Sequence, residues 1–132
     1  MAFVQPCFIR KNTPELREKL RDLGYFYNGY ETAFGEPKNL YASFGSYWEM
    51  SGDNKPSRYE FIIDCGVNEE LFIALASMTN VIHGIHDYYI VIVNDHPRYK
   101  YGSIHKGLPV SSVIHPSCYR KATAKELIEH FK

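Results

Sequence analysis

The segment 88–94 (YYIVIVN) places the strongest constraint on the fold, because both of its alternating faces are apolar. Successive side chains of a strand point to opposite faces of the sheet, so this strand has to be central and covered on both sides. The helix predicted over residues 69–78 is apolar almost all round from Leu71 onward, and it also needs cover on most of its circumference. Three helices and about six short strands in 132 residues provide little cover for both this strand and this helix. We therefore expect a symmetric dimer that buries part of the aromatic surface between its subunits.

Three helices are predicted from their start and stop signals. In the first, Thr13 is the N-cap, Pro14 takes the first helical position and Gly24 ends the helix in a left-handed conformation. Asn68 caps the second helix, and the segment 123–126 (TAKE) forms a capping box for the third. The first helix has a leucine stripe, and its charged residues are expected to face water. That stripe consists of Leu16, Leu20 and Leu23, and the charged residues are Arg17, Glu18, Lys19, Arg21 and Asp22.

Strands are predicted wherever short segments are rich in apolar or aromatic residues or alternate between apolar and polar ones. Pro6 places the first strand at a sheet edge, because proline cannot donate a backbone hydrogen bond. Residues 95–97 form the turn of a hairpin that begins with the 88–94 strand. The other predicted strands cover residues 3–9, 25–27, 40–48, 59–64, 98–105 and 110–114.

Strands outnumber helices, and no regular alternation of strand, helix and strand is present. The predicted fold class is therefore α+β, with a mainly antiparallel sheet of about five to six strands and three helices. The length of 132 residues is close to that of one average domain, so a single domain over 1–132 is expected.

Charge and cysteine content exclude several classes of protein. Fifteen Lys and Arg residues balance fifteen Asp and Glu residues, which argues against a protein that coats nucleic acid or an anionic membrane. The three cysteines form no CxxC motif and fit a reducing compartment. The longest apolar runs, 71–76 and 88–93, are far shorter than the roughly 20 residues of a membrane helix. We therefore expect a cytoplasmic protein without a membrane or a sequence-specific nucleic-acid partner.

Two helix starts share one pattern, in which adjacent cations precede a threonine N-cap. Positive charge near a helix N-terminus is slightly unfavourable, but it becomes favourable when an anion binds the free N–H groups. The pattern predicts a pair of phosphate or carboxylate sites, and the alternative is that both cation pairs are merely solvated. The residues concerned are Arg10, Lys11 and Thr13 at the first helix and Arg120, Lys121 and Thr123 at the third.

Aromatic residues are abundant, with eleven Tyr, eight Phe and one Trp. An aromatic face beside Arg or Lys can stack a nucleobase or anchor a protein partner. Tyr47 and Trp48 are the residues expected to stack a base. The alternative is a small core built from large side chains, with tyrosines on half-buried strands.

Other candidate sites are weaker. His83, His86, His115 and Cys118 could together form a tetrahedral metal site, but the arrangement matches no standard ligand pattern, so no metal or cofactor is expected. Cys65, just before the second helix, could be a nucleophile and is more simply a small core residue. No catalytic motif is present, so no catalytic residue is assigned and an enzyme ranks third among the functions considered.

Three segments carry a resemblance to known proteins. They are 9–25, which begins IRKNTPEL, 64–76, which begins DCGVNEELF, and 121–131 (KATAKELIEHF). Together they resemble small uncharacterised proteins encoded by phages and prophages of gut Bacteroidetes. The resemblance carries over no catalytic or ligand residue. It implies a small viral protein that is made inside a bacterium.

In that setting, the expected function is binding. The first hypothesis is a counter-defence protein that sequesters an anionic, nucleotide-like signalling molecule. Its phosphate would bind the two cation pairs, and its base would stack on the aromatic rings. The alternative is an interaction protein that masks or recruits a host protein through an aromatic patch.

Overall fold

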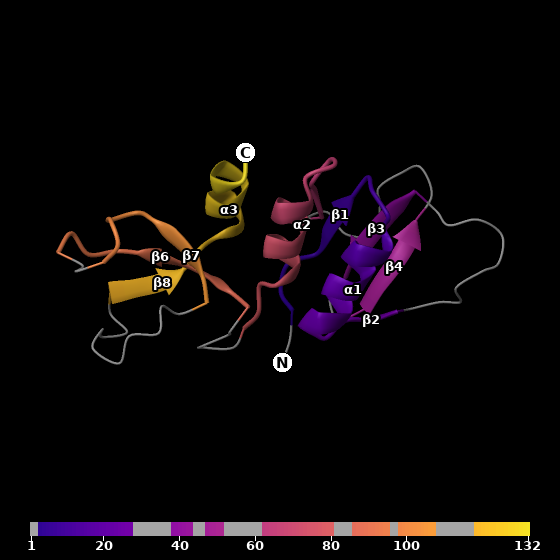
Figure 1. Cartoon of the computed structure of the whole chain (residues 1–132), viewed down its shortest axis with the longest axis horizontal. Coiled ribbons are helices and arrows are strands. Elements are labelled where there is room, and N and C mark those ends of the chain that lie inside the picture. The colour runs from indigo at the N-terminus through magenta and orange to yellow at the C-terminus, as the bar shows by residue number, and fades with distance from the viewer. Residues whose placement is uncertain are drawn as a thin grey trace.

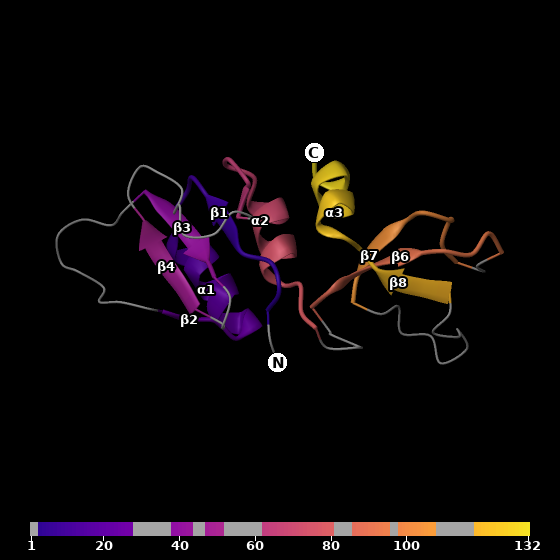
Figure 2. The same ribbon diagram turned by 180° about the vertical axis from the view of Figure 1, so that it is seen from behind.

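The computed structural model describes residues 3–27, 38–43, 47–51, 62–80, 86–95, 98–107 and 118–132. The molecule is elongated and has two lobes (Figure 1). The N-terminal lobe holds strands β1 to β5 with helices α1 and α2, and the C-terminal lobe holds β6 to β8 with α3. The view from behind shows the same arrangement, with α2 and α3 facing each other where the lobes meet (Figure 2).

Helix α1 (Pro14–Leu23) forms as its sequence predicts. The Thr13 side chain accepts a hydrogen bond from the Leu16 N–H, and Gly24 ends the helix at φ 114°. The leucine stripe is buried, as expected. Arg17 does not face water as predicted, because it is buried with 8% of its surface exposed and its guanidinium donates to the Asn12 side chain.

The N-terminal lobe contains a five-stranded sheet in the order β2-β4-β3-β1-β5. Strand β1 (Cys7–Ile9) pairs antiparallel with β3 (Asn39–Ala42) and parallel with β5 (Ile63–Asp64). The first strand is therefore not at an edge, contrary to the prediction. It begins only after Pro6, so the missing proline N–H removes no bond from the ladder.

The predicted strand over 40–48 is two strands. Strand β3 pairs antiparallel with β4 (Tyr47–Ser51), with Ala42 opposite Trp48. Residues 44–46 lie outside the described residues, and the sequence is apolar on both sides of them. Because the apolar pattern is continuous, the sequence carries no sign that the chain reverses between the two strands. Strand β2 (Phe26–Tyr27) pairs parallel with β4 at the edge of the sheet.

Helix α2 (Glu69–Ala76) begins at its Asn68 cap, as predicted, and is buried along most of its surface. It packs against β1, α1 and α3. The Asn68 side-chain amide also donates to the Phe131 carbonyl at the end of α3, at 2.6 Å. The cover that α2 needs is thus supplied by its own lobe and completed by α3 of the second lobe. The burial of α2 therefore does not require a second copy of the chain, and the dimer stays a prediction.

The C-terminal lobe contains a three-stranded antiparallel sheet in the order β7-β6-β8. Strand β6 (Tyr88–Val91) lies between β7 (Ile104–Lys106) and β8 (Tyr119–Lys121), so its predicted central position is confirmed. The predicted cover on both faces is only partial, because Tyr88 and Ile90 are half-buried, and the strand ends at Val91 instead of Asn94. Strand β8 was missed, because the segment 119–121 (YRK) is short and mostly charged. The predicted strand over 110–114 lies outside the described residues.

Helix α3 (Ala124–His130) starts at the predicted capping box. Its Leu127 is fully buried in the same hydrophobic cluster as Leu16, Leu20 and Phe72. One core cluster therefore continues from the N-terminal lobe into the C-terminal lobe.

The α+β class is confirmed, with three helices among the described residues. The expectation of one sheet is not met, because the strands are divided between two sheets. None of the helices in the described part of the chain is long and apolar enough to cross a membrane.

Candidate functional site

The cations predicted at the start of α1 are already paired with carboxylates. The Arg10 guanidinium lies 2.9 Å from the Asp64 carboxylate, and the Lys11 ammonium lies 3.2 Å from that of Glu69. Thr13 caps α1 with its side-chain oxygen. The first predicted anion site therefore has its positive charge compensated within the chain.

The second cation pair is also compensated. Arg120 donates two hydrogen bonds to Glu126, at 2.6 and 2.8 Å. These bonds raise the pKa of Arg120 and, together with bonds from Thr123, lower the pKa of Glu126 to about 2. Thr123 is the capping residue of α3, as predicted.

Lys121 lies where the two lobes meet, beside the buried Asp87 carboxylate, which is bound by groups of Thr79 and Lys121. Asp87 accepts from the Thr79 N–H at 2.9 Å and from the Thr79 hydroxyl at 2.6 Å. The Lys121 ammonium lies 3.3 Å from the same carboxylate and donates to the Thr79 carbonyl at 2.9 Å. This group, called here the Asp87 joint, is structural, because it ties the end of α2 to β6 and β8.

The two aromatic residues expected to stack a base are placed differently. Trp48 is fully buried in the core, and the Arg21 guanidinium lies 5.6 Å from the centre of its ring, so the ring is not open to a surface ligand. The Tyr47 side chain lies outside the described residues, although its backbone belongs to β4. The structure thus does not bring the Trp48 ring to the predicted cation pairs, and the stacking role of Tyr47 stays a prediction.

The candidate metal ligands are only partly described, since His83 and His115 lie outside the described residues. The other two are in different places, because His86 borders a cavity whereas Cys118 packs beside Tyr119. No group of three potential ligands that could hold a metal ion occurs in the described ranges. Cys65 is buried in the core, as the simpler interpretation predicted.

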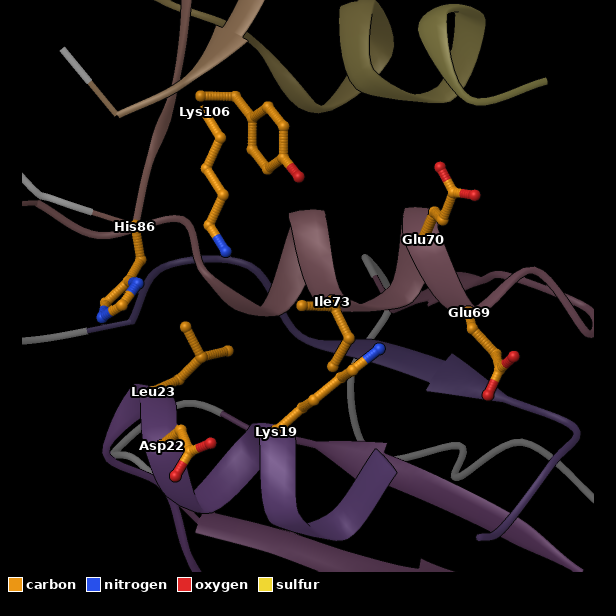
Figure 3. A pocket seen from close by; sticks show the side chains of 9 residues that line it. Lys19, Asp22, Leu23, Glu69, Glu70, Ile73, His86 and Lys106 are labelled. Carbon is orange, nitrogen blue, oxygen red and sulfur yellow. The ribbon is translucent and has the colours of Figure 1, made fainter. Parts of the chain in front are cut away.

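A cavity of about 580 Å³ lies where the two lobes meet, and it is the candidate functional site. We call it the interlobe cavity. Its volume falls within the range that small-molecule pockets occupy. Figure 3 shows its walls, which come from α1 and α2 on one side and from β6 and β7 on the other. The lining residues are Lys19, Asp22, Leu23, Glu69, Glu70, Ile73, His86, Tyr88 and Lys106.

Helical spacing explains why the α1 and α2 residues share this cavity. Lys19, Asp22 and Leu23 are three and four positions apart, and so they lie on one face of α1. Glu69 and Ile73 are four positions apart on α2. On the opposite wall, Lys106 is the direct partner of Tyr88 in the antiparallel pair of β7 and β6.

Two lysines enter the cavity from opposite lobes. Lys106 extends from the C-terminal lobe and Lys19 from α1 (Figure 3). Within the described ranges, neither lysine forms an ion pair. The cavity cations thus differ from Arg10, Lys11, Arg120 and Lys121, which all have carboxylate partners.

The cavity also holds acidic groups and a tyrosine. Glu69 is compensated by Lys11, whereas Asp22 and Glu70 form no ion pair within the described ranges. Burial, and then the negative charge of Glu70, raise the pKa of Tyr88. The Tyr88 hydroxyl therefore stays protonated at neutral pH and can donate a hydrogen bond.

The Asp87 joint holds one wall of the cavity in place. Asp87 follows the lining residue His86, and its carbonyl accepts a hydrogen bond from the Gly107 N–H at 2.7 Å. Gly107 in turn follows the lining residue Lys106. A buried, fully bonded group therefore fixes the chain beside two cavity side chains.

Sequence reasoning missed this site. Lys19 and Asp22 are exposed, as predicted, but nothing in the sequence indicated that they border a cavity, and Lys106 belongs to no motif. The only sequence signal was indirect, in that α2 needed cover from a distant element. A charged face of α1 beside α2 could then have been recognised as a cavity wall.

Comparisons of this chain with protein-family models, with curated proteins and with solved structures find no match.

Proposed function

We propose that the chain is a small binding protein that holds an anionic, base-bearing molecule of the nucleotide class in the interlobe cavity. The observation that carries this proposal is the pair of lysines, Lys19 and Lys106, that reach the cavity from opposite lobes without a carboxylate partner among the described residues. Phosphate oxygens are natural partners for two ammonium groups.

The remaining lining supports the rest of such a ligand. Tyr88 is half-buried and offers an aromatic ring beside Lys106, which suits contact with a base. Asp22 and Glu70 can accept hydrogen bonds from hydroxyl or amino groups of the ligand. A cavity with a few convergent polar groups and an aromatic wall is typical of small-molecule sites.

The resemblance to phage proteins supplies the biological part of the proposal. A phage protein of this kind would act in the host bacterial cytoplasm and sequester a nucleotide-like signalling molecule, so that a host defence response fails. The proposed site is the interlobe cavity instead of the helix starts that the sequence predicted, and the proposed ligand class is the same.

The proposal is tested by thermal shift and calorimetry with mono-, di- and cyclic nucleotides at millimolar concentration. A ligand at 100 times its dissociation constant should add about 2.7 kcal/mol to the free energy of unfolding. The double variant Lys19→Gln/Lys106→Gln should lose the shift, and Lys100→Gln, at an exposed lysine outside the cavity, should retain it. If no nucleotide raises the melting temperature of the unaltered protein, the proposal is wrong.

A protein partner is the second candidate, and one observation favours it. Phe26 is 67% exposed on β2, which is an edge strand among the described residues, and a sheet edge with an apolar ring can receive another chain. Tyr101 is similarly exposed but belongs to the other lobe, between β6 and β7. The partner complex should tolerate salt and weaken in Phe26→Ser, whereas nucleotide binding should be unaffected by that change.

A further inference from the structure

We infer that the interlobe cavity selects ligands with a single phosphoryl group over nucleoside triphosphates. The inference rests on the proposed function and adds to it the ligand's charge. It is carried by the balance and the placement of the charges that line the cavity.

The charges of the lining residues nearly cancel. Lys19 and Lys106 contribute two positive charges, and Asp22 and Glu70 contribute two negative ones, while Glu69 is compensated by Lys11. His86 adds a cation only in its imidazolium form. A site that held three phosphates without a metal ion would need an excess of positive charge, because each phosphate oxygen has to replace its hydration.

The placement of the acids limits how far a phosphate chain can extend. In Figure 3, Glu70 points toward the C-terminal lobe and Glu69 toward the opposite side of α2, so carboxylates flank the cavity at the start of that helix. The Glu70 charge is felt at Tyr88, which stands beside Lys106. A second or third phosphate would add negative charge to a cavity whose lining already holds these carboxylates, and like charges at short range are unfavourable.

The same carboxylates are useful to a smaller ligand. The positive charge of the two lysines is enough to compensate one phosphoryl group, and the ribose hydroxyls or the amino group of a base can then donate to Asp22 or Glu70. A cavity whose lysines bind one phosphate and whose carboxylates bind the nucleoside fits a monophosphate or a cyclic monophosphate.

The test is calorimetry of the full chain, with EDTA present, against four probes that share one base. The probes are the nucleoside, its 5′-monophosphate, its cyclic monophosphate and its triphosphate, and inorganic phosphate is a fifth titration. At least one of the two monophosphates should bind about tenfold or more tightly than the triphosphate, and more tightly than the nucleoside or inorganic phosphate. A triphosphate that binds as tightly as both monophosphates overturns the inference but leaves the proposed function in place. Failure of every nucleotide overturns both.

A charge variant tests the cause of the selectivity. Glu70→Gln should bring the triphosphate to within about threefold of the preferred monophosphate, because it removes the repelling charge and keeps the side-chain size. Glu70 is exposed, so the variant should fold. Glu129→Gln, at another exposed glutamate outside the cavity, should leave the ratio unchanged. If Glu70→Gln also leaves the ratio unchanged, the carboxylate does not set the selectivity and the inference is wrong.

Discussion

The Asp87 joint and the interlobe cavity are neighbours between the same two lobes, yet they treat charge in opposite ways. In the joint, a carboxylate that is almost completely buried has the Thr79 and Lys121 groups as partners. In the cavity, Lys19 and Lys106 have no ion pair within the described ranges. Charge that holds a fold together is paired inside the chain, whereas charge that is left without a partner in a cavity is available to a ligand. Stability and binding should therefore respond to different residues.

The largest effect is expected from Asp87→Ala. The change removes the partner of the buried Thr79 N–H and hydroxyl and of the Lys121 ammonium, whose side chain is 29% exposed, so it should lower the free energy of unfolding by about 2 to 4 kcal/mol. Urea unfolding followed by circular dichroism measures this loss. Asp95→Ala, at an exposed aspartate, is the control and should stay within about 0.5 kcal/mol of the unaltered protein. A loss below 1 kcal/mol for Asp87→Ala would show that the joint does not hold the lobes together.

The ion pair of Arg120 and Glu126 gives an intermediate, pH-dependent effect. The folded-state pKa of Glu126 is lowered to about 2 from an ordinary value of 4.5, so its contribution is fully present above pH 4.5 and is lost as the pH falls toward 2. Arg120 is 47% exposed and solvent screens the pair, which limits the contribution to about 1 to 2 kcal/mol. Glu126→Gln should therefore lower stability at pH 7 and reduce the difference in stability between pH 5 and pH 2.5. Equal pH slopes for the variant and the unaltered protein would contradict this assignment.

The smallest effect on stability is expected at the cavity lysines. Lys19→Gln and Lys106→Gln remove no ion pair among the described residues, so each should change the free energy of unfolding by no more than about 0.5 kcal/mol. Each should weaken monophosphate binding by about tenfold or more, because a charge-assisted hydrogen bond is lost. If either lysine variant destabilises the ligand-free protein as strongly as Asp87→Ala, the cavity lysines also hold the fold together, and the proposed difference between the two regions is wrong.

The fold was predictable where the signal was local. The caps at Thr13, Asn68 and Thr123 each depend on a few adjacent residues, and all three helices begin where those residues indicate. The central position of β6 was predictable because its residues form a continuous apolar run. Strand β8 and the chain reversal between β3 and β4 were not predictable. A short charged strand has the pattern of a loop, and an apolar hairpin has the pattern of one longer strand.

The site was less predictable than the fold, because it depends on which distant elements meet. Arg10 and Arg120 lie beside helix starts and were therefore predicted to bind an anion. The tertiary structure brings Asp64 to Arg10, and the capping box of α3 brings Glu126 to Arg120. Lys19 and Lys106 are separated by 87 positions, and only the packing of α1 and β7 around α2 brings them to one cavity. Sequence patterns report the charge of a residue but not the presence of a partner.

The dependence of α2 on α3 for cover has a consequence for synthesis of the chain. Helix α2 ends at Ala76 and α3 begins at Ala124, so a ribosome has to add a further 47 residues before the cover starts to form. At about 5–20 residues per second, an apolar helix waits roughly 2 to 10 s for its partner. During that interval the nascent chain presents a surface that chaperones bind, and a nascent chain released before α3 is made would keep that surface exposed and tend to aggregate.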